Sequence, residues 1–504
     1  MANSKYDVVV AGGALGGLIC AAILSKRGYK VALVDEINQP GSRAGAIESS
    51  EHKGYWINMS RRDGHGIIDG AIHGGNTARA FELAGIKPDY EGQSPSWRIH
   101  NPVLGTVVES FIGVSMGEMT SPDPLKDYRE LALVSGVPAD RVNDVAAAVN
   151  TALTRLAAMG EEQAWLLIEE TFGGWLKRNV EDHHARQVIL QMLETQPSSP
   201  AEQTSVGRFI FHLKGGAYQK NAVGYPKYPG VGGLQGAMSL FADAIKSNGG
   251  EIWLGWKPAE ILTERRRVTG LVAINETSFV KTFEARVVIT DLPCWDLPTL
   301  LDPELLPHDF VTMAENIKSY TVSCAGWWAG LKRPPTLRST GQKEDVYKWA
   351  WNRMIRGEAG ERKVYSGIWG FMGGSRGMAP SIAPADKHLM VVWRPSFGEF
   401  RYRNFAEAKS YIDANLDYIR KFYLDLDDCI EWSDYQFQTH GAWPGWHLKP
   451  IRRHPVKIST ITGLYLASGT AEGKGEWSDA EPEAALAVVQ LVEEDCGMPI
   501  SHRS

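Results

Sequence analysis

The feature that most constrains the fold of this chain is an apolar, strand-like segment that ends in a cluster of glycines. Residues 7–11 (DVVVA) lead into GGALGG at 12–17, and the apolar residues that continue to Leu24 have the composition of a helix. A second apolar segment, residues 31–36, ends on two acidic side chains. A strand, a glycine turn, a helix and an acid-ended strand are typical of the βαβ unit that binds a dinucleotide.

Each part of this unit has a chemical reason. Glycines at positions 12 and 17 let the backbone approach a pyrophosphate, and the positive end of the helix dipole faces its charge. Asp35 is placed to accept hydrogen bonds from a ribose. Ala14 stands where the second glycine of the pattern is usual, so we expect a slightly displaced pyrophosphate. The alternative is a βαβ unit that only packs, and the agreement of both strands, the helix and the acid favours the nucleotide site.

The composition indicates a globular protein with more than one domain. The chain has 504 residues, of which 43% are hydrophobic and 22% charged. A net charge of −6 argues against non-specific nucleic-acid binding. The five cysteines lack metal-type or disulfide-type spacing, so we expect no metal site and a reducing, cytoplasmic compartment. Neither a secretory signal nor an apolar run of about 18 residues is evident, while a peripheral membrane contact stays open.

Segments of nucleotide-binding character recur in the middle and at the end of the chain. Residues 228–234 form a glycine turn that leads into an amphipathic helix, and residues 285–291 read as a buried parallel strand. Residues 463–467 are a strand that meets a glycine-rich turn at 469–475, and a helix is expected over 481–494. Nucleotide-binding character is therefore predicted at the beginning, in the middle and at the end of the chain.

Two segments of different character lie between these stretches. Residues 142–193 have apolar side chains at helical spacing, and the pair His183 and His184 is interpreted as a solvated helix start rather than a metal site. Residues 323–393 contain tryptophan-rich strands, and a helix is expected over 406–424. Six tryptophans are predicted to line one sheet, mostly as core, where they could also wall an apolar pocket: Trp327, Trp328, Trp349, Trp351, Trp369 and Trp393.

This interleaving resembles the FAD-dependent carotenoid desaturase and retinol saturase group, within the flavin amine oxidase and protoporphyrinogen oxidase superfamily. The residues that carry the resemblance are the first glycine unit with Asp35, 40–44 (PGSRA), Trp175-Leu176, Tyr228-Pro229, 232–234 (GGL), the strand that ends at Asp291, 441–446 (GAWPGW), Pro455 and 463–467 (GLYLA). It covers most of the chain. It implies an α/β (α+β overall) fold in which residues 1–90, 225–300 and 440–504 form a Rossmann-like FAD-binding domain. Residues 91–224 and 301–439 then form an interleaved substrate-binding domain with a helical insert.

The resemblance also implies which residues meet FAD. The implied set is Gly12, Gly13, Ala14, Leu15, Gly16, Gly17, Asp35, Glu36, Gly41, Ser42 and Arg43 around the ADP half, Pro258 and Ala259 at the adenine, Asp291, and Gly469, Thr470 and Ala471 at the ribityl and flavin end. Pro258 stands where a valine is usual and has no N–H, and Gly469 stands where many relatives have an acid. Because residues 438–475 contain no cysteine, we expect non-covalent FAD.

The candidate catalytic residues surround the segment expected near the flavin ring. Trp443 and Trp446 would cover the ring, although both could serve packing alone. His440 and His447 are the titratable residues there with a near-neutral pKa, so they are acid–base candidates beside a structural alternative.

The leading functional interpretation is an FAD-dependent oxidoreductase of the desaturase or saturase kind. It would transfer a hydride or two electrons between flavin and a mainly apolar unsaturated small molecule. The alternatives are a flavin amine (heteroatom) oxidase, a flavin-dependent non-redox isomerase and a non-enzymatic prenyl-protein escort. No second dinucleotide fingerprint for NADPH is evident, so oxygen, a quinone or a partner protein would accept the electrons; the oligomeric state stays open.

Overall fold

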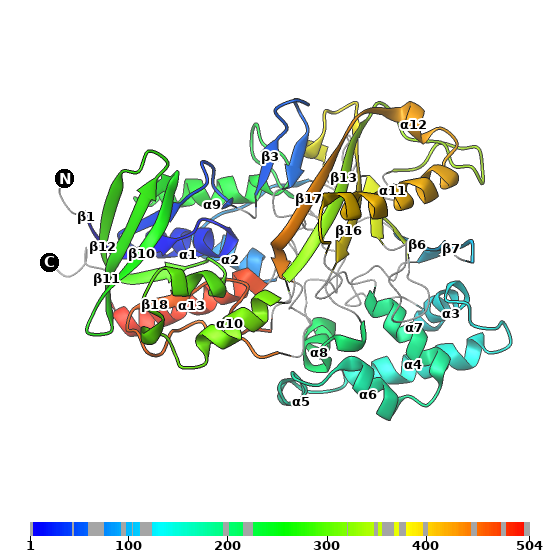
Figure 1. Cartoon of the computed structure of the whole chain (residues 1–504), viewed down its shortest axis with the longest axis horizontal. Helices are drawn as coiled ribbons and strands as arrows, with labels where there is room; N and C mark the ends of the chain where they lie inside the picture. Colours follow the sequence, from blue (N-terminus) through cyan, green and yellow to red (C-terminus); the bar gives the residue numbers. More distant parts are fainter. Residues whose placement is uncertain are drawn as a thin grey trace.

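The structure is a computed structural model in which two seven-stranded sheets and a group of helices are arranged side by side (Figure 1). It describes residues 4–42, 45–58, 75–91, 97–102, 104–110, 123–194, 201–214, 225–319, 321–346, 351–354, 367–371, 380–396, 402–444, 451–474 and 480–497. This mixture confirms the predicted α/β (α+β overall) class.

The first sheet contains the βαβ unit predicted at the beginning of the chain. Its strand order is β10-β11-β12-β1-β2-β9, and β18 pairs with the end of β12 on the side opposite β1. The strands from β12 to β9 and the β12–β18 pair are parallel, whereas β10, β11 and β12 are joined as an antiparallel meander. The bounds are β1 (Ser4–Ala11), β2 (Val31–Asp35), β9 (Glu251–Leu254), β10 (Trp256–Glu264), β11 (Arg267–Asn275), β12 (Val280–Thr290) and β18 (Leu464–Leu466).

Helices cover one face of this sheet. The central helix α1 (Leu15–Lys26) is buried on all sides except at Lys26, as expected for a helix that is apolar all round. It contacts α2 (Asn76–Ala84), α9 (Gln235–Ser247) and α13 (Ala480–Cys496). The opposite face packs against residues of β10 and β11, α10 (Phe310–Ser319) and two short 3₁₀ helices at Cys294–Thr299 and Pro303–Leu305.

β10 and β11 form a hairpin. Arg265 and Arg266 form its tip with positive φ angles of 51° and 58°, the geometry of a tight hairpin turn. β9 and β10 are separate strands, because Gly255 adopts a φ of +73° and turns the chain from one into the other.

The second sheet has the order β17-β13-β16-β15-β14-β6-β7. All its neighbours are antiparallel except β14 and β6. The bounds are β6 (Trp97–Asn101), β7 (Thr106–Ser110), β13 (Thr321–Leu331), β14 (Trp351–Met354), β15 (Gly367–Phe371), β16 (His388–Ser396) and β17 (Ile430–Pro444). The long helix α11 (Phe405–Phe422) covers one face, and α12 (Leu426–Cys429) leads into β17.

The tryptophans of the second sheet divide between its two faces. Trp327 and Trp369 are buried with α11, whereas Trp328 and Trp393 belong to the buried cluster that contains β1, α1 and α9. Neighbouring residues of a strand point to opposite faces, so Trp327 and Trp328 cannot share a wall. Trp351 lies in β14 of the same sheet, and Trp349 lies outside the described residues.

The helical insert forms a separate apolar core below the second sheet (Figure 1). Its helices are α3 (Pro124–Val134), α4 (Val142–Ala157), α5 (Glu161–Leu166), α6 (Phe172–Asn179), α7 (His183–Glu194) and α8 (Val206–Lys214), with a 3₁₀ turn at Ala201–Gln203. His183 opens α7, at the predicted helix start.

Two small antiparallel pairs complete the described chain. They are β3 (Ala46–Glu48) with β4 (Trp56–Asn58), and β5 (Tyr90–Glu91) with β8 (Tyr225–Pro226); a further 3₁₀ turn lies at Pro380–Ile382. None of the described helices has both the length and the apolar character needed to span a bilayer. We propose that the first sheet with its helices makes up the FAD-binding domain, and the second sheet with the insert the substrate-binding domain.

Candidate FAD site

The glycine turn between β1 and α1 leaves no room for side chains. Gly12 has a φ of +106°, and a Cβ there would overlap the carboxylate of Asp291. A Cβ on Gly16 would overlap the carbonyl oxygen of Ala467, which belongs to the turn after β18. Close packing therefore requires glycine at both positions, and the backbone conformation requires it at Gly12 as well.

The first turn of α1 retains donors for an anion. Ala14 caps α1 without a side-chain hydrogen bond, and within the first helical turn the Gly17 N–H donates to Asp291, which leaves the amides of Leu15 and Gly16 to face an anion. Such a terminus attracts a phosphate through its N–H groups and its dipole. The predicted pyrophosphate contact at residues 12–17 stays a prediction, and this geometry fits it.

Asp35 ends β2 directly beside the glycine turn. Its Oδ2 accepts a hydrogen bond from the Gly13 N–H (2.5 Å), and its Oδ1 accepts one from Ile37 N–H (2.7 Å). Burial raises the pKa of Asp35, while these backbone donors oppose the shift. Each carboxylate oxygen has a second lone pair, so the side chain can also accept from a ribose. Glu36, the neighbouring candidate, is exposed.

Asp291 follows β12 and fills the other side of the glycine turn. Its Oδ2 accepts a hydrogen bond from the Gly17 N–H (2.9 Å), at the N-terminus of α1. Burial, and then the nearby Asp35 carboxylate, raise the pKa of Asp291 well above its usual range. This shift of the pKa disfavours a second buried negative charge beside the place where a pyrophosphate would bind.

The turn after β18 meets this site from the far end of the chain. The Ala467 N–H donates to Thr290 O (2.8 Å), which continues the β12–β18 pairing beyond the strand. Thr470 is buried and its hydroxyl accepts from the Cys294 N–H (3.0 Å). Arg453 Nη1 donates to the carbonyl oxygens of residues 469 and 471, at 3.1 and 3.2 Å. We call residues 468–473 the closing turn.

The loop after β2 is held by a residue that the sequence did not single out. Gln235, the first residue of α9, donates from Nε2 to Pro40 O (2.9 Å) and accepts at Oε1 from the Ala46 N–H (3.2 Å). Gly41 (φ +100°) and Ser42 (φ +44°) complete the loop. Gln235 directly follows the predicted turn at 228–234, and this position was the only available signal. Arg43 lies outside the described residues.

The remaining predicted cofactor and catalytic residues lie in β10, in β17 or outside the described residues. Pro258 and Ala259 lie in β10, at an irregularity in its pairing with β11 that accommodates a residue without an N–H. His440 and Trp443 lie in β17, where the structure describes the backbone alone. Trp446 and His447 lie outside the described residues.

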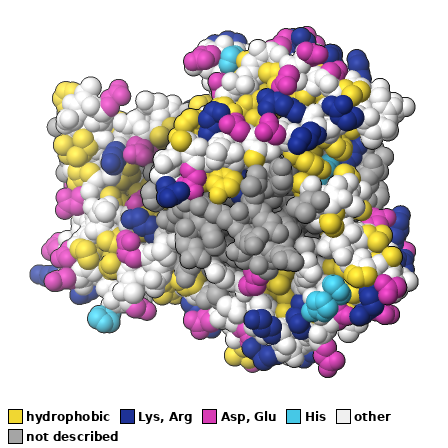
Figure 2. Space-filling view, turned by 45° about the vertical axis from the view of Figure 1, so that its right-hand side comes forward, with side chains coloured by type: hydrophobic (Ala, Val, Ile, Leu, Met, Phe, Trp, Pro, Cys, Tyr) yellow, Lys and Arg dark blue, Asp and Glu magenta, His cyan; other side chains and the backbone are white. Residues whose placement is uncertain are grey.

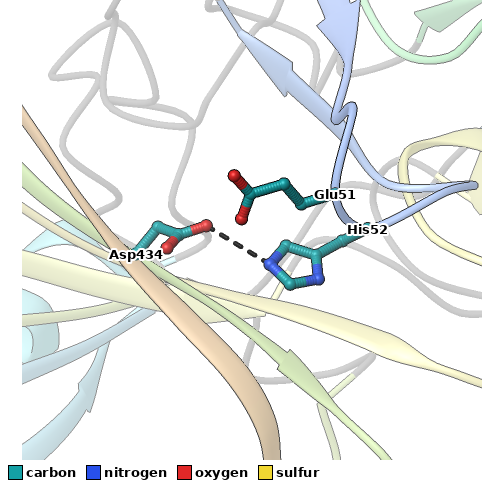
Figure 3. A group of neighbouring side chains, drawn as sticks. All are labelled: Glu51, His52 and Asp434. Atoms are coloured by element: carbon teal, nitrogen blue, oxygen red, sulfur yellow. Dashed lines mark ion pairs between the residues drawn. The ribbon is translucent and has the colours of Figure 1, made fainter.

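A cluster of Glu51, His52 and Asp434 joins the β3–β4 hairpin to β17 of the second sheet at the surface (Figure 3). His52 Nε2 lies 3.4 Å from Asp434 Oδ2, and its ring stacks on Trp432 at 4.0 Å. Glu51 and Asp434 are exposed. We interpret the cluster as a contact between the β3–β4 hairpin and β17, since exposed ion pairs of this kind are common.

The residues around the glycine turn fit FAD. The cradle that Cβ atoms would fill, the amides at the start of α1 and the acid at the end of β2 suit its ADP half. The closing turn reaches the same edge of the sheet.

Comparisons with known proteins agree with this geometry. Residues 15–394 match the family described as flavin containing amine oxidoreductase. No curated protein matches the whole sequence significantly. These findings establish the family and leave the narrower desaturase and saturase group as a proposal.

Solved structures of similar fold include several oxidoreductases. An oxidoreductase from Methanosarcina mazei is 16% identical with a TM-score of 0.67, over 96% of this chain and 100% of that one. Cyclohexylamine oxidase from Brevibacterium oxydans is 14% identical with a TM-score of 0.58, over 97% and 99% of the two chains. Putrescine oxidase bound to putrescine is 14% identical with a TM-score of 0.57, over 97% and 99%. The chain therefore belongs to the flavin-containing amine oxidoreductase family and is an FAD-dependent oxidoreductase.

Proposed function

We propose that the protein transfers a hydride or two electrons between non-covalently bound FAD and a mainly apolar small molecule, across a carbon–carbon bond. The observation that carries this proposal is the uncharged, aromatic character of the face of the second sheet opposite α11, whose buried core continues into the first sheet and its helices. Trp328, Val391 and Trp393 share one buried cluster with β1, α1 and α9. The Trp328 indole N–H donates to the neutral Gln436 side chain (3.0 Å). Side chains of this kind favour an apolar ligand over a charged one.

The chain would hold the cofactor and exclude water, while FAD supplies the two-electron chemistry when bound. The backbone of residues 12–17 would bind the pyrophosphate, and Asp35 would bind the ribose. Gly469, Thr470 and Ala471 would contact the flavin end. His440, Trp443, Trp446 and His447 remain the proposed residues nearest the reacting atoms. Oxygen, a quinone or a partner protein would complete the redox cycle.

Oxidation of an amine is the second candidate function. The family match itself favours it, since the family is described by amine oxidoreduction. Cyclohexylamine oxidase and putrescine oxidase are also among the proteins of similar fold. Oxidation of an amine by flavin removes two electrons from the substrate, as oxidation of a carbon–carbon bond does. The same cofactor can therefore serve either reaction.

Anaerobic reduction of the bound flavin distinguishes these candidates. The oxidised protein is mixed under anaerobic conditions with apolar hydrocarbons and enones, and separately with cyclohexylamine and putrescine, while flavin absorbance is recorded. The photoreduced protein is mixed with the corresponding alkenes to detect the reverse transfer. Spectral change with the apolar compounds alone supports the proposal, and bleaching by amines alone replaces it with amine oxidation. Conversion of a substrate by reduced flavin without net reoxidation indicates an isomerase.

A further inference from the structure

The helical insert contributes one buried cation to the FAD-binding part of the molecule. Arg208, in α8, is 0% exposed. A buried guanidinium is unfavourable unless charged or carbonyl partners compensate its lost hydration. The identity of these partners therefore indicates what this arginine does.

Within the described residues, the Arg208 guanidinium donates to partners in the C-terminal part of the chain. Nη1 donates to Gly473 O (2.8 Å), and Nη2 donates to Glu472 Oε1 (3.0 Å) and to Ile451 O (3.4 Å). Gly473 and Glu472 belong to the closing turn. The arginine thus joins a helix of the insert to a segment more than 240 positions away.

Glu472 also forms a hydrogen bond with a second arginine, Arg453. Its Oε2 accepts a hydrogen bond from the Arg453 N–H (2.5 Å). The Arg453 side chain in turn donates to the carbonyl oxygens of Gly469 and Ala471. The side chains of Arg208, Glu472 and Arg453 therefore fix the backbone of the closing turn, and Ala467, just before it, packs against Gly16 of α1.

Two exposed contacts surround the buried one. Lys474 Nζ lies 2.6 Å from Glu161 Oε1 of α5, and Arg452 Nη2 donates to Trp165 O (3.4 Å). In Figure 1, α5 and α8 lie on the side of the insert that faces α10 and α13. The interface thus has an ionic centre at Arg208 and a solvated rim, and only the centre is shielded from water.

We propose that Arg208 is a positioning residue of the FAD site: through Glu472 it sets the shape and the local charge of the closing turn from within the helical insert. The inference rests on the proposed placement of the flavin end at residues 469–471. Because coupling between two equilibria is reciprocal, docking of the insert strengthens FAD binding and bound FAD strengthens docking.

The charge of Arg208 should affect the reduction potential of the flavin in a specific way. Removing the Arg208 cation leaves the Glu472 carboxylate poorly compensated beside the flavin end. A nearby negative charge opposes the negative charge that flavin gains on reduction, so the reduction potential falls. Removing both charges together avoids this effect.

The test compares four variants with the wild type. Arg208→Met removes the cation, Arg208→Met with Glu472→Gln removes the pair, and Arg208→Lys keeps the charge without the forked geometry. Lys474→Met is the matched control, because it breaks an exposed ion pair in the same interface. FAD affinity is measured by titrating deflavinated protein, the reduction potential by dye equilibration, and stability by thermal unfolding.

The proposal predicts that Arg208→Met weakens FAD binding about tenfold or more and lowers the reduction potential, since breaking a buried pair strands its partner. The double variant recovers most of the wild-type reduction potential. The reduction potential of Arg208→Lys lies between those of the wild type and Arg208→Met. Lys474→Met changes FAD affinity by less than about twofold, as expected for an exposed pair.

Two results overturn the proposal. In the first, Arg208→Met unfolds at lower temperature but retains wild-type FAD affinity and potential, which indicates a merely structural role. In the second, the double variant shows the same lowered potential as Arg208→Met. If Arg208→Met does not fold, the reduction potentials of the double variant and of Arg208→Lys test the proposal in its place. Wild-type protein that binds FAD but is reduced by no offered substrate contradicts the proposed function and leaves this inference standing.

Discussion

Asp291 is the residue on which the chemistry of the glycine turn depends most. Its carboxyl group lies between the turn and α1 and accepts the Gly17 N–H. The sequence predicted its position at the end of a strand beside the nucleotide site. It could not predict the burial, because Gly17 lies 274 positions away and the contact requires the assembled sheet.

Asp291→Asn should stabilise the FAD-free protein in a pH-dependent way. Burial raises the pKa of Asp291 in the folded protein, whereas the unfolded chain loses this proton near pH 4. Above that pH, ionisation favours the unfolded state, and below it both states are protonated. We expect the variant to raise the free energy of unfolding at pH 7 by on the order of 1 kcal/mol, with the gain fading toward pH 4.

Urea unfolding at both pH values measures this difference. Asp140→Asn, in an exposed loop, is the control and should show no pH-dependent gain. A gain from Asp291→Asn that is the same at pH 4 and pH 7 would show that ionisation of Asp291 is not its cause.

Gly16→Ala should damage the turn although Gly16 lies inside a helix. The added Cβ would overlap Ala467 O and push the closing turn away from α1. Overpacking of this kind costs about 1–3 kcal/mol, and FAD affinity should fall with it. At Gly160 a Cβ would meet nothing within 4 Å, so Gly160→Ala should leave FAD affinity unchanged. Equal FAD affinity of the two variants would exclude the proposed close approach.

Among the elements, the loop between β2 and β3 depends on α9. Gln235 connects Pro40 and Ala46 through both atoms of its amide. Gln235→Ala leaves the buried Ala46 N–H and the partly buried Pro40 carbonyl without this partner, which costs about 1–3 kcal/mol. The loop should then open more often, and FAD should dissociate faster.

Stopped-flow release of FAD measures this effect. Gln490→Ala, on the exposed side of α13, is the matched control and should release FAD at the wild-type rate. An unchanged release rate for Gln235→Ala would mean that the loop does not contact the cofactor.

At the scale of helices and strands, the sequence predicts the features that depend on neighbouring residues alone. The strand, turn and helix around residues 7–24 were predictable because glycine and an apolar run act within one short segment. The partition of Trp327 and Trp328 between two faces follows from strand alternation, but which face meets α11 depends on the tertiary arrangement. Arg208 carried no motif, since a charged residue within a helix usually points to solvent.

In the whole molecule, two sheets built from interleaved segments lie side by side (Figure 1). On the face shown in Figure 2, basic and acidic side chains are interspersed over the described surface. The order of the strands was not predictable, because β18 joins β12 across more than 170 positions of sequence. The interleaving itself was recognisable, since each of its three stretches has its own glycine turn.

The central claim is that this assembled edge of the first sheet binds FAD without a covalent bond. The most direct measurement is the visible spectrum of the purified protein, followed by acid precipitation and analysis of the supernatant. We predict an oxidised flavin spectrum and release of about one equivalent of intact FAD per chain, as expected for a non-covalent cofactor. A colourless protein that binds no added FAD would contradict the claim, and flavin retained in the precipitate would contradict its non-covalent part.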